Sequence, residues 1–276
     1  MRSLNLIRVT VIAALVPLAM AGSETKAPIA KLTVQQIVDK NVTARGGLSA
    51  WRAVNTLEMK GKMDAGGNQR STIPVPNESE AAKVVPKRPS EQAQLPFLMD
   101  LQRGHKVRVE IEFHGQTAVQ VYNGSQGWKL RPFLNRHQVE NFTADELKAA
   151  SKDSDLDGLL IDYSSKGAKV DLEGVEVVDG RNCYKLKVTD KSGNVRHDWV
   201  DAETFLETKV EGNPRRLDGK EHPVATYFSD YRPVNGIVMP YVLETRVEGV
   251  KDTEKILIES IVANPKLDDS RFAMPR

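Results

Sequence analysis

The chain has 276 residues, with 39 Lys and Arg against 37 Asp and Glu. The two kinds of charge are interspersed, so the sequence lacks the basic stripe that a nucleic-acid-binding protein needs. Cys183 is the only cysteine, which excludes an internal disulfide and leaves stability to a packed core.

The first 21 residues have the composition of a secretory signal peptide. Arg2 and Arg8 provide the positive charge, residues 9–18 form an apolar run, and Ala19-Met-Ala21 offers small residues at a cleavage site after Ala21. The apolar run is shorter than the roughly 20 residues that span a bilayer. We therefore expect an exported protein in the periplasm, with residues 22–32 as a linker. Loss of the two arginines leaves 37 basic and 37 acidic residues.

Helices are expected at two places in the folded region, residues 33–276. Thr33 stands at an N-cap position, apolar residues follow it at helical spacing, and Gly46-Gly47 ends the helix. Residues 48–54 predict a further helical turn that carries Trp51. A second helix is expected over residues 143–150, where Thr143 and Glu146 have the spacing of a capping box.

From Asn55 onward the apolar residues recur with a period of two, which is typical of strands with one buried face. Turn signals such as His114-Gly115, Asn123-Gly124 and Asn235-Gly236 separate the strands and predict antiparallel neighbours. We expect a mainly β fold: an incomplete antiparallel barrel of about ten or eleven strands, with a few helices over an apolar cavity. The alternating segments are residues 57–63, 97–103, 107–113, 184–188, 206–210, 227–231, 241–247 and 256–262.

Residues 64–96 interrupt this pattern. The segment is rich in Gly, Pro, Ser, Asn, Gln and charged residues and has few aromatic ones, so it predicts a long mobile loop inserted between two strands. The rest of residues 33–276 is expected to form one domain. Its last part, residues 264–276, predicts an irregular tail laid along the barrel.

The stretch VYNGSQGW, residues 121–128, raises the question of a nucleophilic serine. A nucleophile elbow has the form G-x-S-x-G between a strand and a helix. Asn123 replaces the first glycine, and the residues after Ser125 alternate like a strand. Asn123-Gly124 is instead a strong hairpin signal, so we assign Ser125 to a turn.

Residues 153–158, DSDLDG, resemble the start of an EF-hand calcium loop. The twelfth position of such a loop should be a bidentate Glu, and here it is Ser164. The flanking residues 159–163 read as a strand rather than a helix. We interpret the segment as a solvated acidic turn.

No other pattern predicts a catalytic, metal or cofactor site. The five histidines lack metal-ligand spacing, no carboxylate pair stands out, and there is no glycine-rich phosphate loop. Cys183 lies in a strand-like run and reads as a packed residue rather than a reactive thiol. We therefore predict no catalytic residues, no metal, no cofactor and no enzyme.

Arg103 is an anomaly at the end of the segment PFLMDLQR. Phe97, Met99 and Leu101 set the apolar parity, and Arg103 continues it toward the dry face. One interpretation is that Arg103 snorkels to water from the strand end. The other is that it lies at a cavity mouth and bonds backbone carbonyls of a covering helix or a polar headgroup.

Several of these residues resemble the outer-membrane lipoprotein-sorting proteins, the LolA- and LolB-like periplasmic carriers. Asn123-Gly124, Trp128 and Pro132-Phe133 are similar to the hairpin of that family, and the segments ARGGLSAW and NPKLDDSRFAMP resemble its larger members. The resemblance covers residues 32–276. It implies an incomplete antiparallel barrel, an apolar cavity that holds lipoprotein acyl chains, and an arginine, here Arg103, that holds the lid shut.

The residues and the resemblance together predict a carrier that binds lipid acyl chains or lipoproteins, without nucleic-acid partners and without a membrane span. The alternative is a sensor or interaction module that binds an envelope protein, using the 64–96 segment for docking. The expected cavity residues are Met59, Phe97, Met99, Leu101, Arg103, Val109, Ile111, Phe113, Val121, Trp128 and Leu130, although the apolar ones suit a plain core equally well.

Overall fold

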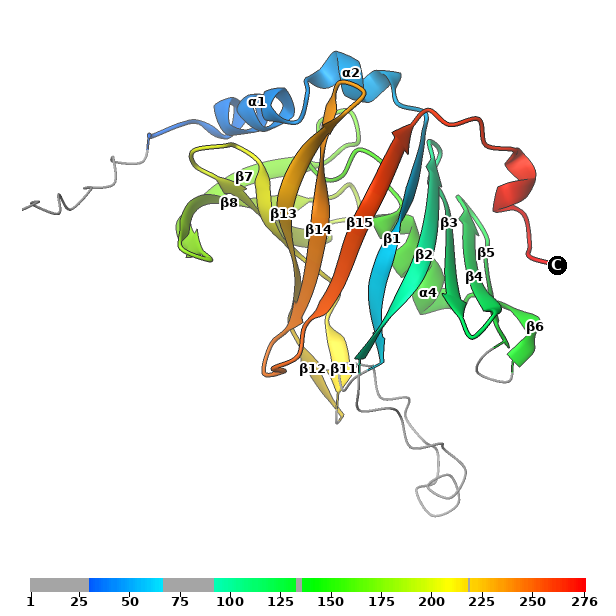
Figure 1. Ribbon diagram of the computed structural model, residues 1–276. Coiled ribbons are helices and arrows are strands. Elements are labelled where there is room, and N and C mark those ends of the chain that lie inside the picture. The colour runs from blue at the N-terminus through cyan, green and yellow to red at the C-terminus, as the bar shows by residue number, and fades with distance from the viewer. Residues whose placement is uncertain (1–29, 67–91, 133–135, 218) are drawn as a thin grey trace, which may run out of the picture. The chain divides into compact units, whose positions relative to one another are not determined.

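A computed structural model describes residues 30–66, 92–132, 136–217 and 219–276. Thirteen strands form one antiparallel sheet in the order β6-β5-β4-β3-β2-β1-β15-β14-β13-β10-β9-β8-β7. The sheet curls but stays open, because its first and last strands do not pair with each other (Figure 1). This confirms the predicted incomplete antiparallel barrel.

The strands are β1 (Thr56–Gly66), β2 (Gln92–Gln102), β3 (Lys106–Phe113), β4 (Gln116–Asn123), β5 (Gly127–Arg131), β6 (Arg136–Asn141), β7 (Lys169–Val178), β8 (Arg181–Thr189), β9 (Val195–Asp201), β10 (Glu207–Glu211), β13 (Val224–Val234), β14 (Ile237–Val247) and β15 (Glu254–Ala263), with β11 (Arg215–Leu217) and β12 (Lys220–His222) as a separate hairpin.

The sheet has more strands than alternation predicts, because some strands lack a clean period of two. β7 carries a bulge between Leu172 and Gly174, which shifts its pattern by one residue. In β9 four successive residues, 198–201, are buried, since both faces of that strand are covered. Such strands give no two-sided polar and apolar pattern in the sequence.

The helices begin where their capping residues predict. Thr33 caps α1 (Val34–Ala44) in a capping box with Gln36. A short α2 (Leu48–Ala53) carries Trp51, as expected. Thr143 and Glu146 cap α4 (Ala144–Asp153), which continues one turn beyond the predicted end.

Strand register defines two faces of the sheet, since directly paired residues lie on the same face. One row runs Met59–Met99–Val109–Gln120–Lys129 across β1 to β5. We call its side the inner face. The neighbouring row, which contains Asp100, Val121 and Trp128, belongs to the outer face.

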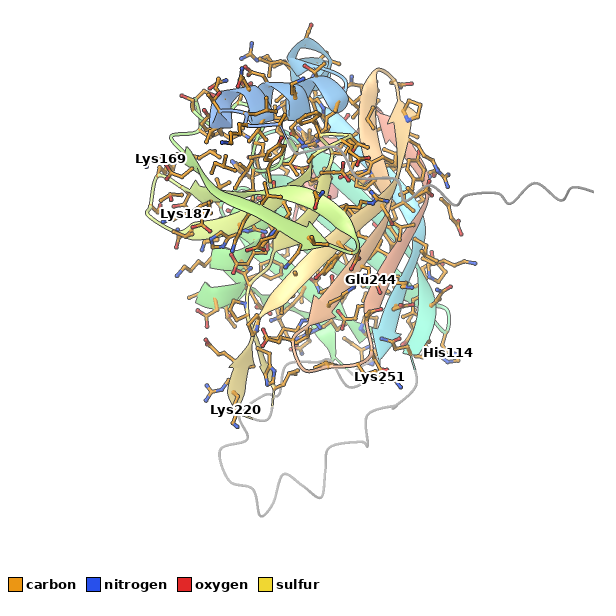
Figure 2. The ribbon with its side chains drawn as sticks, turned by 90° about the vertical axis from the view of Figure 1, so that its left-hand side faces the viewer. His114, Lys169, Lys187, Lys220, Glu244 and Lys251 are labelled. Carbon is orange, nitrogen blue, oxygen red and sulfur yellow. The ribbon has the colours of Figure 1, made fainter. Side chains whose placement is uncertain are left out.

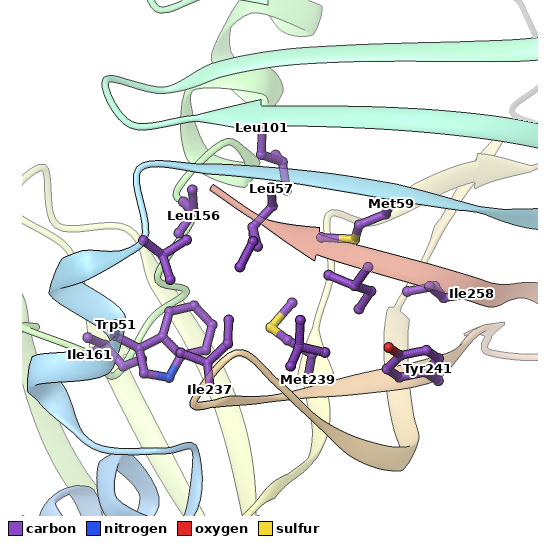
Figure 3. Close-up of a cluster of buried hydrophobic side chains, with 14 of the residues drawn as sticks. Trp51, Leu57, Met59, Leu101, Leu156, Ile161, Ile237, Met239, Tyr241 and Ile258 are labelled. Carbon is purple, nitrogen blue, oxygen red and sulfur yellow. The ribbon is translucent and has the colours of Figure 1, made fainter. Parts of the chain in front are cut away.

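The largest buried cluster lies on the inner face beneath α2 (Figure 3). Trp51, Leu57, Ile161 and Ile237 have no exposed surface, and all four belong to this cluster. Residues 159–163 contribute to it through a turn segment, 156–167, so the predicted strand there is wrong. A short apolar run is compatible with a strand or with a buried irregular segment, and here burial on the sheet decides for the turn.

The C-terminal tail covers part of the outer face. Residues Asp269–Phe272 form a 3-10 helix, and Phe272 packs with Val119 and Val121 of β4. Arg271 pairs with the fully buried Asp100 of β2 at 2.5 Å. Elsewhere the outer face carries a small cluster of Val178, Cys183 and Trp199, and charged residues such as Lys187 and Glu244 project from it (Figure 2).

Part of the predicted loop is regular: residues 64–66 extend β1 and residues 92–96 begin β2. Residues 67–91 lie outside the described residues. The predicted signal peptide, residues 1–21, also lies outside them, as do positions 22–29 of the predicted linker.

Candidate ligand-binding site

The α1–α2 segment is docked on the turn between β13 and β14. The carbonyl oxygen of Arg45 accepts hydrogen bonds from the Val238 amide at 2.9 Å and from Trp51 Nε1 at 2.8 Å. Gly46 has a φ of +108°, and a Cβ on it would lie 2.2 Å from the carbonyl oxygen of Gly236. Only glycine allows this close approach of the two backbones.

Arg103 ties this segment to the sheet. Its Nε donates to the carbonyl oxygen of Val54 and its Nη2 to that of Trp51, both at 2.5 Å. The same guanidinium forms two bonds of 2.8 Å with the carboxylate of Asp157. These contacts match the interpretation in which Arg103 bonds the backbone of a covering helix, rather than the one in which it only reaches water.

Asp157 corrects the interpretation of residues 153–158 as a solvated turn. It is 6 % exposed and serves as the bidentate partner of Arg103. Asp153 pairs with Arg196 at 3.0 Å, and Asp155 pairs with Lys166 at 2.6 Å. Each of these acids therefore pairs with a different basic side chain. The described residues contain no group of three or more His, Cys, Asp or Glu that could hold a metal.

We call α1, α2 and the turn segment 156–167 the lid. Arg45, which follows α1, is a second link between the two parts of the lid and the sheet. It lies 4.2 Å from the Trp51 ring, donates to the carbonyl oxygen of Asp157 at 3.2 Å, and pairs with Glu207 of β10 at 3.3 Å. Arg45 and Arg103 therefore hold the same lid from two sides.

A second acid lies beside the ion pair of Arg45 and Glu207. Asp198 of β9 is fully buried, and neither of its carboxylate oxygens has a hydrogen-bond partner among the described residues. Burial away from water, together with the charge of Glu207, raises the pKa of Asp198 well above its usual range. Burial likewise raises the pKa of Tyr231, whose hydroxyl donates to the carbonyl oxygen of Glu207.

Sequence reasoning missed this buried polar group. Arg45 directly precedes Gly46-Gly47, which ends the helix, and Glu207 is not part of any carboxylate pair that stands out in the sequence. One signal was available in β9, where Asp198 shares the parity of the apolar Val200 and therefore points to the inner face.

A cavity of about 1030 Å³ lies between the inner face and the lid. This is at the upper end of the roughly 300–1,000 Å³ found for small-molecule sites. Arg45, Glu207 and Tyr231 form a polar part of its wall, and a smaller hollow of about 410 Å³ beside Arg103 shares His105 and Lys166 with it. The apolar lining consists of Met59, Tyr122, Leu156, Leu159, Ala168, Val188, Val210, Phe228, Met239, Pro240, Leu243 and Ile258.

The predicted cavity residues separate into two groups. Seven apolar ones share the inner face: Met59 lines the cavity, and most of the others pack in or against the cluster under the lid. These seven are Met59, Phe97, Met99, Leu101, Val109, Ile111 and Phe113.

Val121, Trp128 and Leu130 do not join them. They lie on the outer face with Phe272, away from the cavity, because Tyr122, Gly127 and Lys129 occupy the inner positions of β4 and β5. Lys129 there is 8 % exposed and pairs with Glu146 of α4 at 2.5 Å, which attaches that helix to the inner face. The tail that covers the three apolar residues is remote in sequence and could not be inferred from their alternation.

The fold is similar to those of several solved proteins. A LolA superfamily protein from Nitrosomonas europaea superimposes with a TM-score of 0.54 at 13% identity, over 88% of this chain and 98% of that chain. A DUF1329 family protein from Desulfovibrio piger gives 0.52 at 15% identity, over 87% and 97%. A domain from Vibrio parahaemolyticus assigned to outer membrane lipoprotein sorting gives 0.50 at 11% identity, over 86% and 94%.

No protein-family model and no curated protein sequence matches the chain significantly. The likeness is therefore one of fold, and it confirms the resemblance to the lipoprotein-sorting superfamily at that level. Among the described residues, no helix combines the length and the apolar character needed to cross a bilayer.

Proposed function

We propose that this protein is a periplasmic carrier that holds the acyl chains of a lipid or lipoprotein in its inner cavity. The observation that supports this most directly is the combination of a cavity of about 1030 Å³ with a lid that Arg103 clamps through backbone carbonyls. Apolar surface in a cavity takes up chains from water with a gain of about 0.8 kcal/mol per buried CH₂.

Arg103 and Arg45 hold the lid through polar contacts, and Trp51 and Ile161 of the lid also pack in the largest buried cluster. Local opening of the lid costs less than unfolding the sheet, and it would widen the cavity so that cargo can leave when a better acceptor is present. The fold similarity to lipoprotein-sorting proteins fits this proposal without identifying the cargo.

The proposal is for a binding protein rather than an enzyme. Ser154 Oγ lies 3.3 Å from His105 Nδ1 beside the smaller hollow, the kind of contact that a nucleophile and its base make. No carboxylate among the described residues bonds the other nitrogen of His105, so the group that orients the base in a triad is missing. Ser125, the other serine in question, bonds Asn123 within a hairpin turn.

The alternative of an interaction module depends on the 64–96 segment. Residues 67–91 of that segment lie outside the described residues, so this function stays a prediction.

Native mass spectrometry of the protein purified from its own cell envelope tests the carrier directly. We expect a stoichiometric adduct that organic extraction identifies as phospholipid or acylated peptide. A protein that is empty when isolated, and that takes up no fluorescent lipid when offered it, would contradict the proposal.

A further inference from the structure

The walls of the cavity differ sharply between the sheet and the mouth. On the sheet side, β14 and β15 present an apolar wall, with Met239, Leu243 and Ile258 among its residues. The mouth lies between α4 and the turn that joins β8 to β9. Lys148 and Lys152 line it from α4, and they lie on one side of that helix because they are four residues apart.

Lys191 faces the same cavity from the β8–β9 turn. Its neighbour Asp190 is already bonded by backbone amides of Ser192 and Asn194, at 2.8 and 2.9 Å. Lys191 also lines the smaller hollow beside Arg103, so the two spaces meet at this side chain. The turn therefore adds a third ammonium group to the mouth.

None of these three lysines forms an ion pair among the described residues, although Asp190 is near enough for Lys152 to attract its carboxylate. The other two cations of the mouth have partners: Arg196 pairs with Asp153, and Lys166 with Asp155. In contrast, no carboxylate among the described residues lies within ion-pair distance of Lys148, Lys152 or Lys191. With Asp190 counted, five basic and three acidic side chains line this rim, so it keeps a surplus of positive charge.

We infer that the ligand of this cavity is an anionic amphiphile, whose phosphate or carboxylate headgroup sits at Lys148, Lys152 and Lys191 while its chain enters the apolar cavity. This inference rests on the proposed function and names its ligand class. A neutral acylglycerol would bury the same chain but would leave the lysine rim without a partner. Exposed lysines near a phosphate surface contribute about 1 kcal/mol each, and salt screens this attraction.

A structural role for the lysines makes a different prediction. Lys152 lies in the last turn of α4, where a cation stabilises the helix dipole by a few tenths of a kcal/mol or more. That effect changes stability but cannot distinguish one headgroup from another. The preference between ligands with identical chains is therefore the diagnostic measurement.

The experiment measures binding of three probes to the full chain by calorimetry: dodecyl phosphate, monolauroylglycerol and inorganic phosphate. The two amphiphiles carry chains of equal length and are used below their micelle concentrations. In about 0.02 M salt we expect dodecyl phosphate to bind at least about tenfold more tightly than the neutral amphiphile, and this preference to shrink in about 0.5 M salt. Inorganic phosphate should bind far more weakly, because it brings no chain.

The triple variant Lys148→Gln/Lys152→Gln/Lys191→Gln should lose the preference and keep its affinity for monolauroylglycerol. The matched control is Lys220→Gln/Lys251→Gln/Lys266→Gln, which removes the same charge from exposed sites; Figure 2 shows Lys220 and Lys251 at the end of the sheet opposite α1. The control should keep the preference.

Equal binding of both amphiphiles would overturn the inference and leave the carrier proposal standing. An equal loss in the control variant would also overturn it, as would phosphate binding as tight as that of dodecyl phosphate. If neither amphiphile binds, the proposed function fails together with the inference.

Discussion

Arg103 and Asp157 form a two-bond ion pair, with Nη1–Oδ2 and Nη2–Oδ1 distances of 2.8 Å. The carboxylate holds the guanidinium at the end of α2, where the guanidinium also bonds two carbonyls. The side chain of Arg103 is 32 % exposed and that of Asp157 only 8 %, so water reaches the pair from one side. The pair joins the two parts of the lid, α2 and the turn segment, through one cation.

Arg103→Leu should therefore loosen the lid without unfolding the sheet. The change removes charged hydrogen bonds worth about 1.5–3 kcal/mol each in buried sites, and less here because the pair is partly exposed. We expect a loss of about 2 kcal/mol in the free energy of unfolding and roughly tenfold faster release of a fluorescent acyl probe in stopped-flow displacement.

Arg52→Leu is the matched control, since Arg52 lies on α2, the helix that Arg103 contacts, and pairs with Asp162, but its side chain is 61 % exposed. This variant should keep the release rate of the unmodified protein. The double variant Arg103→Leu/Asp157→Asn should be no faster than the single one if the pair acts as a unit. Unaltered release in Arg103→Leu, with a normal melting curve, would return Arg103 to a snorkelling role.

The sequence predicts the elements well where one face of a strand is wet. Residues 107–113 alternate cleanly and form β3, and the capping boxes at Thr33 and Thr143 mark real helix starts. At Arg103 the apolar parity leaves two interpretations open, and the structure shows the one in which the arginine bonds backbone carbonyls.

What the sequence does not predict depends on contacts between distant segments. Val121 looks like a cavity residue until Phe272 covers it from the chain end. Asp157 looks like an exposed acid until Arg103, 54 residues earlier, pairs with it. Alternation defines which residues share a face, but it does not say which face a remote segment will cover.

Asp198 should make stability depend on pH. Burial raises its pKa in the folded state, so the folded protein holds a proton that the unfolded chain has lost. The stabilising contribution is complete below the unfolded pKa, near 4, and falls as the pH rises toward the folded pKa. In urea denaturation, the free energy of unfolding of Asp198→Asn should change less with pH, between about pH 5 and pH 8, than that of the unmodified protein.

Asp230→Asn provides the opposite sign as a control. The hydrogen bond from Arg232 lowers the pKa of Asp230, so its contribution is present above the unfolded pKa and is lost as the pH falls. For this variant, the slope of the free energy of unfolding against pH should be unchanged between pH 5 and pH 8. If Asp198→Asn also leaves it unchanged, Asp198 is ionised in the folded protein and Arg45 compensates both acids.

Gly46→Ala should undock the α1–α2 segment. Its Cβ would collide with the carbonyl of Gly236, and the residue has a φ of +108°. We expect a loss of more than about 2 kcal/mol, because backbone must move. Gly47→Ala is the control: its φ is +88°, but no atom lies within 4 Å of the added Cβ, so only the conformational cost of about 1–2 kcal/mol applies. Equal melting temperatures for the two variants would show that the contact with Gly236 is dispensable.

The two faces of the sheet should respond differently to substitution. Phe272→Ala removes a side chain that is 2 % exposed and packs on Val121, so it should cost about 3 kcal/mol in stability and leave acyl-probe affinity unchanged. Leu243→Trp instead adds volume on the cavity wall, and it should reduce probe binding at least about tenfold with a smaller effect on stability. Denaturant melts and fluorescence titration of both variants separate the two effects. A loss of affinity in Phe272→Ala would mean that the outer cluster with Val121, Trp128 and Leu130 takes part in binding after all.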